Sequence, residues 1–500
     1  MRGILTAAIA AALGAAISPA EAVLLNPRGT GQVLIYSYYT VNHQQTLVSV
    51  INTTARGKAL KVRFREAYDG REVANFNVYL GPYDSWVGAV FDASSNGTGA
   101  AAIATNDNSC TDPLFPLVAD SATLHALTFS NANYSQGGYG MATGTDNGPT
   151  NLARTREGFF EMIEMGEVVD QAIRGHNTLE AITPVGGNPP DCAQVRNAWK
   201  NDGYWNAYPT TDLLPPAGGL YGSAGIVDVA LGTLYAYNAT AIDGFSDVVQ
   251  NTRVGDAKPN LSTAITDSSH DIAKAYVPIG NTMIKADYPA AARAIDAVSG
   301  VLTAGMLANE YVTDPRVGAS SEWVITFPTK QFYVDPGIVG FQQDNGALPP
   351  FETGFDIYSC SGLTTTSYDR EGNPLPTGVG FPEPPITGGN YLCYESQLIT
   401  FNQSGVEPGI PTMVFGSLLG SNYDVYSNGW FALSFEGSAK QLRASLEGNV
   451  FLGLPAIGFL AVNYINANVT PGVLSNYSGV YAHRSTVSCT NSTNPQNACQ

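Results

Sequence analysis

A run of four glutamates between residues 157 and 167 is the first segment in which catalysis could be sought. Cleavage of a glycosidic bond needs two carboxyl groups, about 5 Å apart for retention and about 6.5 to 9.5 Å apart for inversion. In a helix Glu157, Glu161 and Glu164 would share one face, whereas in a strand Glu161 and Glu164 would fall on opposite faces. Glu161 and Glu164 are the candidates for such a pair, but a structural segment whose charges face water is the preferred interpretation, because most charge runs face solvent.

Histidine gives little support for a hydrolase. The five histidines are His43, His125, His176, His270 and His483. None has a second histidine four residues away, so the spacing of a helical zinc site is missing. Residues 268–271 contain serine, histidine and aspartate, but neighbouring side chains point apart and catalytic triads are assembled from separate elements.

Two further patterns could bind a ligand. Asp107 and Asp112 belong to an oxygen-rich segment that could hold calcium, although it lacks the glycine and the distal glutamate of an EF-hand loop. Trp199 and Trp205 lie near acidic residues and could stack on sugar rings, although packing in a core is the commoner use of tryptophan. A plain polar loop and ordinary packing are the preferred interpretations, and no cofactor is expected.

Cysteine usage predicts disulfides. The six cysteines are Cys110, Cys192, Cys360, Cys393, Cys489 and Cys499. An even number in an exported chain, with no close C-x-x-C pair, is typical of a disulfide framework and not of a zinc site. Among the fifteen connectivities that six cysteines allow, we expect sequential pairing, because each consecutive pair encloses a plausible loop.

The elements that position these residues are mostly strands. Residues 58–66 alternate without error, with Leu60, Val62 and Phe64 on one face and Lys61, Arg63 and Arg65 on the other. This period of two predicts a half-buried strand. Residues 33–39, 46–51 and 74–80 also resemble strands, and Gly, Asn and Pro turns separate them. The predicted fold class is mainly β, with antiparallel β-sandwiches and long Gly/Asn-rich loops.

One core helix is predicted at residues 289–309. Pro289 suits its first position, and one apolar stripe runs along it, formed by Ile295, Val298, Leu302 and Met306. Gly300 and Gly305 would each cost the helix about 1 kcal/mol relative to alanine. Its stability must therefore come from packing.

The start of the chain predicts export. Arg2, an apolar run and the small residues Ala20 and Ala22 form the three parts of a secretory signal. The expected organisation is a signal peptide at residues 1–22, N-terminal β-sandwich strands at 23–92, a loop-rich insertion with a short helix at 93–220, a mainly β region at 221–483 that includes the helix, and a polar disulfide-tied tail at 484–500.

Composition and net charge argue against some classes of partner. Charged residues make up 13% of the 500 residues, and the net charge is -18. Phosphate backbones repel such an acidic chain, so nucleic acid is not expected as a partner. No segment after the signal reaches the 18 or so apolar residues of a transmembrane helix, and none is expected.

The N-terminal strands also resemble a known group. The stretch Asn26-Pro-Arg-Gly-Thr-Gly-Gln-Val-Leu-Ile-Tyr36, followed by Thr46-Leu-Val-Ser-Val-Ile-Asn-Thr-Thr54, is similar to exported proteins of Gram-negative bacteria whose N-terminal region is an immunoglobulin-like β-sandwich. The resemblance covers about 70 residues of turn-separated strands. It implies export and a sandwich fold, and it assigns no catalytic residue.

The sequence therefore favours binding over catalysis. We expect an exported protein, in the periplasm, on the outer surface or in the medium, that acts as a surface, adhesion or structural binding protein for a surface or glycan partner. One alternative is a secreted glycan-active enzyme or carbohydrate-binding protein that uses Glu161, Glu164, Trp199 and Trp205. A second alternative, suggested by the many tyrosines and glycines, is an outer-membrane β-barrel.

Overall fold

The computed structural model describes residues 22–94, 99–119, 121–135, 146, 148–170, 176–339, 346–354, 359–375, 390–403, 410–437, 440–466, 470, 472–493 and 499. The fold is mainly β, as predicted, with 46% strand and 11% helix. Almost all of the predicted signal peptide, residues 1–21, lies outside the described residues. Within the described ranges, no helix is long and apolar enough to cross a membrane.

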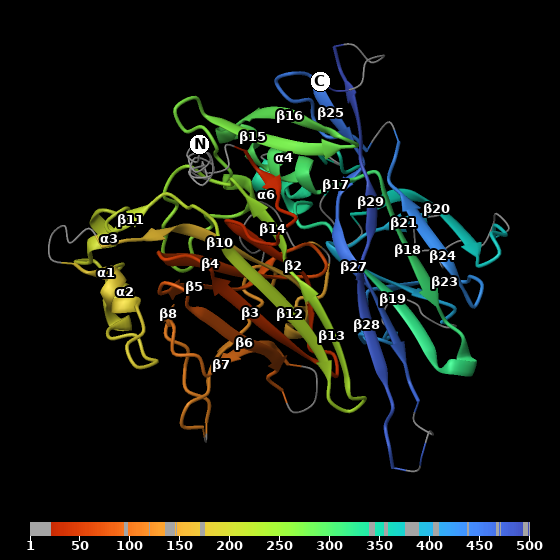
Figure 1. The fold of residues 1–500 in the computed structure, drawn as a ribbon, viewed down its shortest axis with the longest axis horizontal. Helices are drawn as coiled ribbons and strands as arrows, with labels where there is room; N and C mark the ends of the chain where they lie inside the picture. The colour runs from red at the N-terminus through yellow and green to blue at the C-terminus, as the bar shows by residue number, and fades with distance from the viewer. Residues whose placement is uncertain are drawn as a thin grey trace, which may run out of the picture.

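The first half of the chain forms a β-sandwich (Figure 1). One sheet has the order β1 (Leu24–Leu25), β14 (Thr240–Asp243), β2 (Val33–Thr40), β10 (Glu157–Val168), β4 (Gly57–Glu66), β5 (Glu72–Leu80) and β8 (Cys110–Asp112), with β11 (Leu213–Leu214) paired to β10. The other has the order β13 (Thr233–Asn238), β12 (Leu220–Asp228), β3 (Gln45–Asn52), β6 (Ser85–Asp92), β7 (Ala101–Thr105) and β9 (His125–Thr128). The inward side chains of both sheets form one apolar cluster, which includes Phe64, Phe76, Trp86, Phe160 and Ile226.

Strand β4 has the predicted period but not the predicted exposure. Leu60, Val62 and Phe64 lie in the sandwich core, as expected. The prediction of a half-buried strand is wrong, because all residues of β4 are buried. The loop at residues 253–259 folds over the basic face, where Arg63 donates to the carbonyl of Pro259 at 2.8 Å and Lys61 donates to that of Arg253.

Residues 93–220 contain more regular structure than the expected loop-rich insertion. Strand β10 lies between β2 and β4 in the sheet, and 11 of its 12 residues are buried. Unlike β4, it carries apolar side chains on both covered faces, such as Phe159 and Phe160, so its sequence lacks a regular alternation. The same region holds a 3-10 helix, η1 (Leu152–Arg156), and the short helices α1 (Thr178–Ile182), α2 (Cys192–Asn197) and α3 (Tyr204–Ala207).

A second sandwich follows in the C-terminal half (Figure 1). One sheet has the order β21 (Asn390–Leu392), β20 (Ser361–Asp369), β24 (Asn428–Ser434), β18 (Met306–Val312) and β29 (Arg484–Thr486). The other has the order β23 (Gly420–Tyr423), β22 (Ser396–Phe401), β19 (Ala319–Thr326), β27 (Ile457–Tyr464) and β28 (Tyr477–Ala482). Trp323 and Phe431 meet between the two sheets at 5.3 Å between ring centroids. The first sandwich packs on the outer face of β27, where Tyr237 stacks on Phe459 at 4.7 Å.

The predicted core helix exists but is shorter than expected. Helix α4 (Ala290–Leu302) follows the hairpin of β15 (Ile272–Ile279) and β16 (Thr282–Pro289), and Pro289 stands just before its first residue. The chain beyond Leu302 is extended, because β17 (Thr303–Ala304) pairs with β26 (Leu454–Pro455) and β18 pairs with β24. Strand pairing therefore overrides the helical stripe, and Gly305 lies outside the helix.

The predicted sequential disulfides are confirmed: Cys110 bonds to Cys192, Cys360 to Cys393 and Cys489 to Cys499. The first of them fastens α2 to strand β8. The expected polar tail at residues 484–500 contributes β29 and β30 (Ser488–Asn491), and β30 pairs with β25 (Asn449–Leu452). The remaining short elements are η3 (Leu261–Thr263), η4 (Pro315–Val317), α5 (Gln331–Val334) and α6 (Pro336–Val339).

Candidate functional site

The two candidate catalytic glutamates lie on opposite faces of β10. Glu164 shares a face with Phe160, which points into the sandwich core, whereas Glu161 shares the outer face with Phe159. Both carboxylates are 0% exposed. A rise of about 3.3 Å per residue separates the two backbone positions by about 10 Å. The strand therefore keeps the two carboxyl groups apart and away from solvent.

Each of these glutamates pairs with a buried cation. Glu161 Oε1 lies 2.9 Å from Arg65, and Glu164 Oε1 lies 2.8 Å from Lys58. Glu164 also accepts the backbone N–H of Gly218 at 2.8 Å. Burial raises the pKa of Glu164, and the contact with Lys58 acts against that rise. Both carboxylates are therefore partners of buried cations, Glu164 on the core face of the sheet and Glu161 on its covered outer face.

The serine, histidine and aspartate of residues 268–271 do not form a triad. Asp271 accepts the backbone N–H of Ala291 at 3.0 Å, and the aspartate beside His270 is Asp267. His270 Nδ1 lies 2.9 Å from Asp267 and 3.0 Å from the hydroxyl of Ser269. A triad uses the two ring nitrogens for its two partners, whereas here one nitrogen faces both. The His270 side chain is 75% exposed, so the turn holds an open hydrogen-bonded cluster.

The remaining sequence candidates have structural partners. Asp107 accepts the backbone N–H of Ser109 at 2.8 Å and so shapes its own loop. Asp112 lies on β8, where burial raises its pKa. Trp205 is fully buried, and Trp199 packs beside it at 5.7 Å between ring centroids. No group of three or more His, Cys, Asp or Glu able to hold a metal ion occurs among the residues the structure describes.

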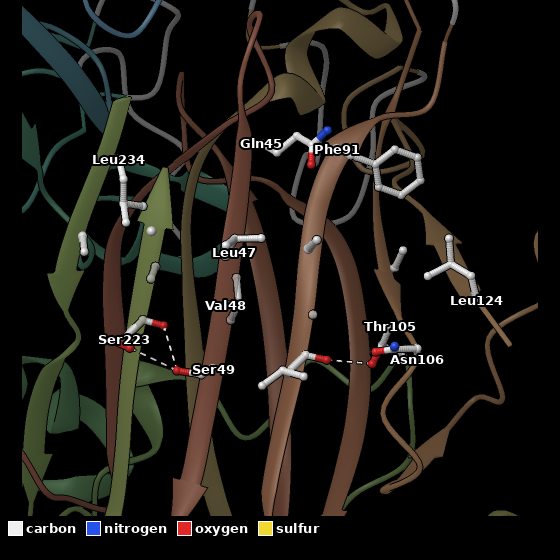
Figure 2. Close-up of a pocket in the computed structure, with 17 residues that line it drawn as sticks. Gln45, Leu47, Val48, Ser49, Phe91, Thr105, Asn106, Leu124, Ser223 and Leu234 are labelled. Carbon is white, nitrogen blue, oxygen red and sulfur yellow. Dashed lines mark hydrogen bonds between the residues drawn. The ribbon is translucent and has the colours of Figure 1, made fainter. Parts of the chain in front are cut away.

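An open groove lies on the outer face of the six-stranded sheet of the first sandwich (Figure 2). Its volume is about 690 Å³, within the range of about 300 to 1,000 Å³ typical of ligand pockets. The register of five strands, from β13 to β7, places its residues in rows across the sheet. One row consists of Ala236, Gly225, Leu47, Ala89 and Ala104.

The groove is uncharged. None of its 17 lining residues is Asp, Glu, Lys, Arg or His. Leu47, Val87 and Leu234 line it and are 47%, 44% and 51% exposed. Small residues leave the space between such side chains open, and Figure 2 shows Leu47 in the middle of the groove with Leu234 toward one side.

The hydroxyl groups that line the groove bond within the protein. The hydroxyls of Ser49 and Ser223 lie 3.1 Å apart and bond to each other, as Figure 2 shows. Thr105 donates its hydroxyl to the carbonyl of Val87 at 2.6 Å. The surface therefore presents mainly aliphatic atoms, and its chemistry suits contact with apolar groups.

The sequence contains one feature that indicates this groove, which is the uncharged character of outward-facing strand residues. Strand β3 alternates buried and more exposed positions, so Gln45, Leu47, Ser49 and Ile51 face outward. A solvated outer face normally carries polar and charged residues. Uncharged residues at the outward positions of several strands would have indicated a binding face, once those strands were known to be neighbours.

Comparisons with known proteins found no match among family models, curated proteins or solved structures. The resemblance of the N-terminal strands to exported bacterial proteins therefore stays a prediction. The function has to be argued from the geometry.

Proposed function

We propose that this chain is an exported, non-catalytic binding protein whose binding site is the groove on the six-stranded sheet. The observation that carries the proposal is the open, uncharged groove in a chain of net charge -18. Exposed apolar patches of this kind mark binding surfaces, because leaving them in water costs free energy. The three disulfides support a location in an oxidising compartment outside the cytoplasm.

The shape of the groove favours an elongated apolar ligand. It extends over five neighbouring strands, which at about 4.8 Å per strand corresponds to a width of about 19 Å. An aliphatic chain or a narrow ring system can contact Leu47, Val87 and Leu234 together. Such a ligand would release water from apolar surface on both sides, which is the main source of affinity in an uncharged site.

An uncharged apolar fluorophore, N-phenyl-1-naphthylamine, tests this proposal. We expect its fluorescence to rise saturably with the wild-type protein. Leu47→Asp places a charge in the middle of the groove and should weaken binding by about tenfold or more, which corresponds to about 1.4 kcal/mol. Leu47 is 47% exposed, so the substitution should leave the fold intact, which circular dichroism checks.

Val185→Asp is the matched control, because Val185 is 72% exposed and does not line the groove. It should bind the fluorophore like the wild type. Absence of saturable binding, or equal loss in both variants, would contradict the proposal. A dimer that Leu47→Asp dissociates would also contradict it, since a second copy of the chain would then cover the groove.

A further inference from the structure

A second groove lies beside the apolar one at the end of the first sandwich. It has a volume of about 1120 Å³ and lies where the β2–β3 turn, the start of β10 and residues 411–418 meet. Gln45 and Phe91 line both grooves. They flank the paired residues Thr46 and Val90. Gln45 precedes Thr46 on β3, and Phe91 follows Val90 on β6. Figure 2 shows Gln45 and Phe91 at one end of the apolar groove and Ser49 and Ser223 toward the other.

The wall of the second groove is polar. Arg156 donates to Asn42 Oδ1 at 3.1 Å and lies 2.9 Å from Asp92. Gln44 is 6% exposed, and its side-chain amide donates to the carbonyl of Val414. The Oε1 atom of Gln44 has no hydrogen-bond partner among the described residues. That atom is itself sealed from solvent, so the polar groups that a ligand could reach in this wall belong to half-buried Asn42 and to exposed His43 and Asn151.

The arginines of this groove are already neutralised by the protein. Arg156 is paired with Asp92, and Arg154 contacts Glu66 at 2.8 Å and also Asp146. Neither guanidinium therefore offers an uncompensated positive charge to an anionic ligand. The carboxylates of Asp92, Glu66 and Asp146 would also repel an anionic ligand.

Glu157 gives the groove no strong affinity for cations. It accepts the hydroxyl of Tyr38 at 2.7 Å and the backbone N–H of Leu418 at 3.3 Å. Burial raises its pKa, which favours the uncharged acid. His43, the histidine of this groove, is exposed. The groove thus combines hydrogen-bonding groups with compensated charges, which suits a neutral ligand rich in hydroxyls.

We infer that the two grooves form one site for an amphiphile. Its neutral, hydroxyl-rich head lies in the polar groove, its aliphatic tail crosses the sheet face, and Gln45 and Phe91 mark the junction. This inference rests on the proposed function and adds the class of ligand. It explains why an apolar face opens at one end onto a polar groove in the same sandwich.

Isothermal titration with n-dodecyl-β-D-maltoside, kept below its micellar concentration, tests the inference. We expect the neutral maltoside to bind about tenfold or more tightly than laurate or dodecyltrimethylammonium, which carry tails of nearly the same length on charged heads. Maltose alone should bind weakly, because it lacks the tail. Equal affinities for the three amphiphiles would overturn the inference.

Variants separate the two parts of the site. Asn151→Ala removes an exposed side-chain amide from the polar groove and should weaken maltoside binding about fivefold or more, with no effect on the apolar fluorophore. Ala230→Trp fills the polar groove from another exposed position and should act in the same way. Leu47→Asp should weaken both ligands. Unchanged maltoside binding by a folded Ala230→Trp protein would contradict the polar half of the site.

The two proposals fail in different ways. If neither the fluorophore nor the maltoside binds, the proposed function is wrong. If the fluorophore binds and the maltoside shows no preference over the charged amphiphiles, only the inferred ligand class is wrong.

Discussion

At the level of single residues, buried ion pairs link β4 to β10, two neighbouring strands in one sheet of the first sandwich. Lys58 and Arg65 from β4 reach Glu164 and Glu161 from β10, and all four are buried. The sequence predicted that Glu161 and Glu164 would lie on opposite faces if the segment were extended, which is what β10 shows. It could not predict their partners, because the residues of one strand do not show which strand lies beside it.

Glu161→Gln should destabilise the protein. The change leaves the buried guanidinium of Arg65 without its charged partner, and losing one member of a buried pair costs about 3 to 5 kcal/mol. Urea unfolding should show a loss of about that size, while Glu310→Gln, at an exposed position of β18, should stay within about 0.5 kcal/mol of the wild type.

The opposite pattern would favour the glycan-active alternative. If Glu161→Gln kept full stability but lost turnover in a glycan hydrolysis screen, Glu161 would act as a catalytic group. Glu164→Gln provides a second test of the same kind.

At the level of elements, local patterns predicted the existence of strands and of the helix better than their limits. The alternation of β4 predicted a strand correctly, but the loop at residues 253–259 decides that both faces are buried. The apolar stripe of α4 continued to Met306, yet β18 starts at that residue because it pairs with β24. A short stretch of sequence does not show which distant strand will pair with it.

Gly300→Ala should stabilise α4. Gly300 lies inside the helix, and a methyl group there would stand 3.4 and 3.5 Å from two ring carbons of Phe451, which is ordinary contact. Alanine is favoured over glycine in a helix by about 1 kcal/mol, so the urea midpoint should rise.

Gly318→Ala is the matched control for that substitution. Gly318 has a φ of +59°, and an added methyl carbon would lie 2.4 Å from the carbonyl oxygen of Ile465. Both features oppose alanine, so the midpoint should fall, by a free energy of more than about 1 kcal/mol. A lower urea midpoint for the Gly300→Ala protein would show instead that close packing against Phe451 requires glycine at this position.

At the level of the whole molecule, residues 412–418 connect the two sandwiches. Glu322 of β19 accepts the backbone N–H groups of Val414 and Phe415, and Gln44 of the first sandwich donates to the carbonyl of Val414. Phe415 also packs against Tyr38 of β2. The junction therefore depends on a carboxyl group that is 1% exposed.

Stability should depend on pH through Glu322. Burial raises its pKa from the usual 4.5 to about 7. Between these values the folded protein holds a proton that the unfolded chain has lost, so this group lowers the free energy of unfolding as pH rises from about 4.5 to about 7. The effect amounts to about 3 kcal/mol and levels off above pH 7.

Glu322→Gln isolates this contribution. Relative to the wild type, the variant should gain stability in urea unfolding between pH 5 and pH 8. A difference between the two proteins that does not change with pH would contradict the raised pKa.

The proposed binding site depends on the pairing of distant strands, and the sequence alone does not show which strands are neighbours. Leu47, Gly225 and Ala89 come from three distant segments and become neighbours only through strand register. The fold class and the disulfide pairing, in contrast, depend on local alternation and on the order of cysteines, and both were predicted correctly.

Photoaffinity labelling tests the location of the site most directly. A dodecyl maltoside that carries a diazirine on its tail is irradiated with the protein, and the labelled peptides are identified by mass spectrometry. We expect the label on β3, β6 and β12, with protection by excess unlabelled maltoside. Saturable labelling confined to the second sandwich, or to the segment around Glu161, would contradict binding on the six-stranded sheet.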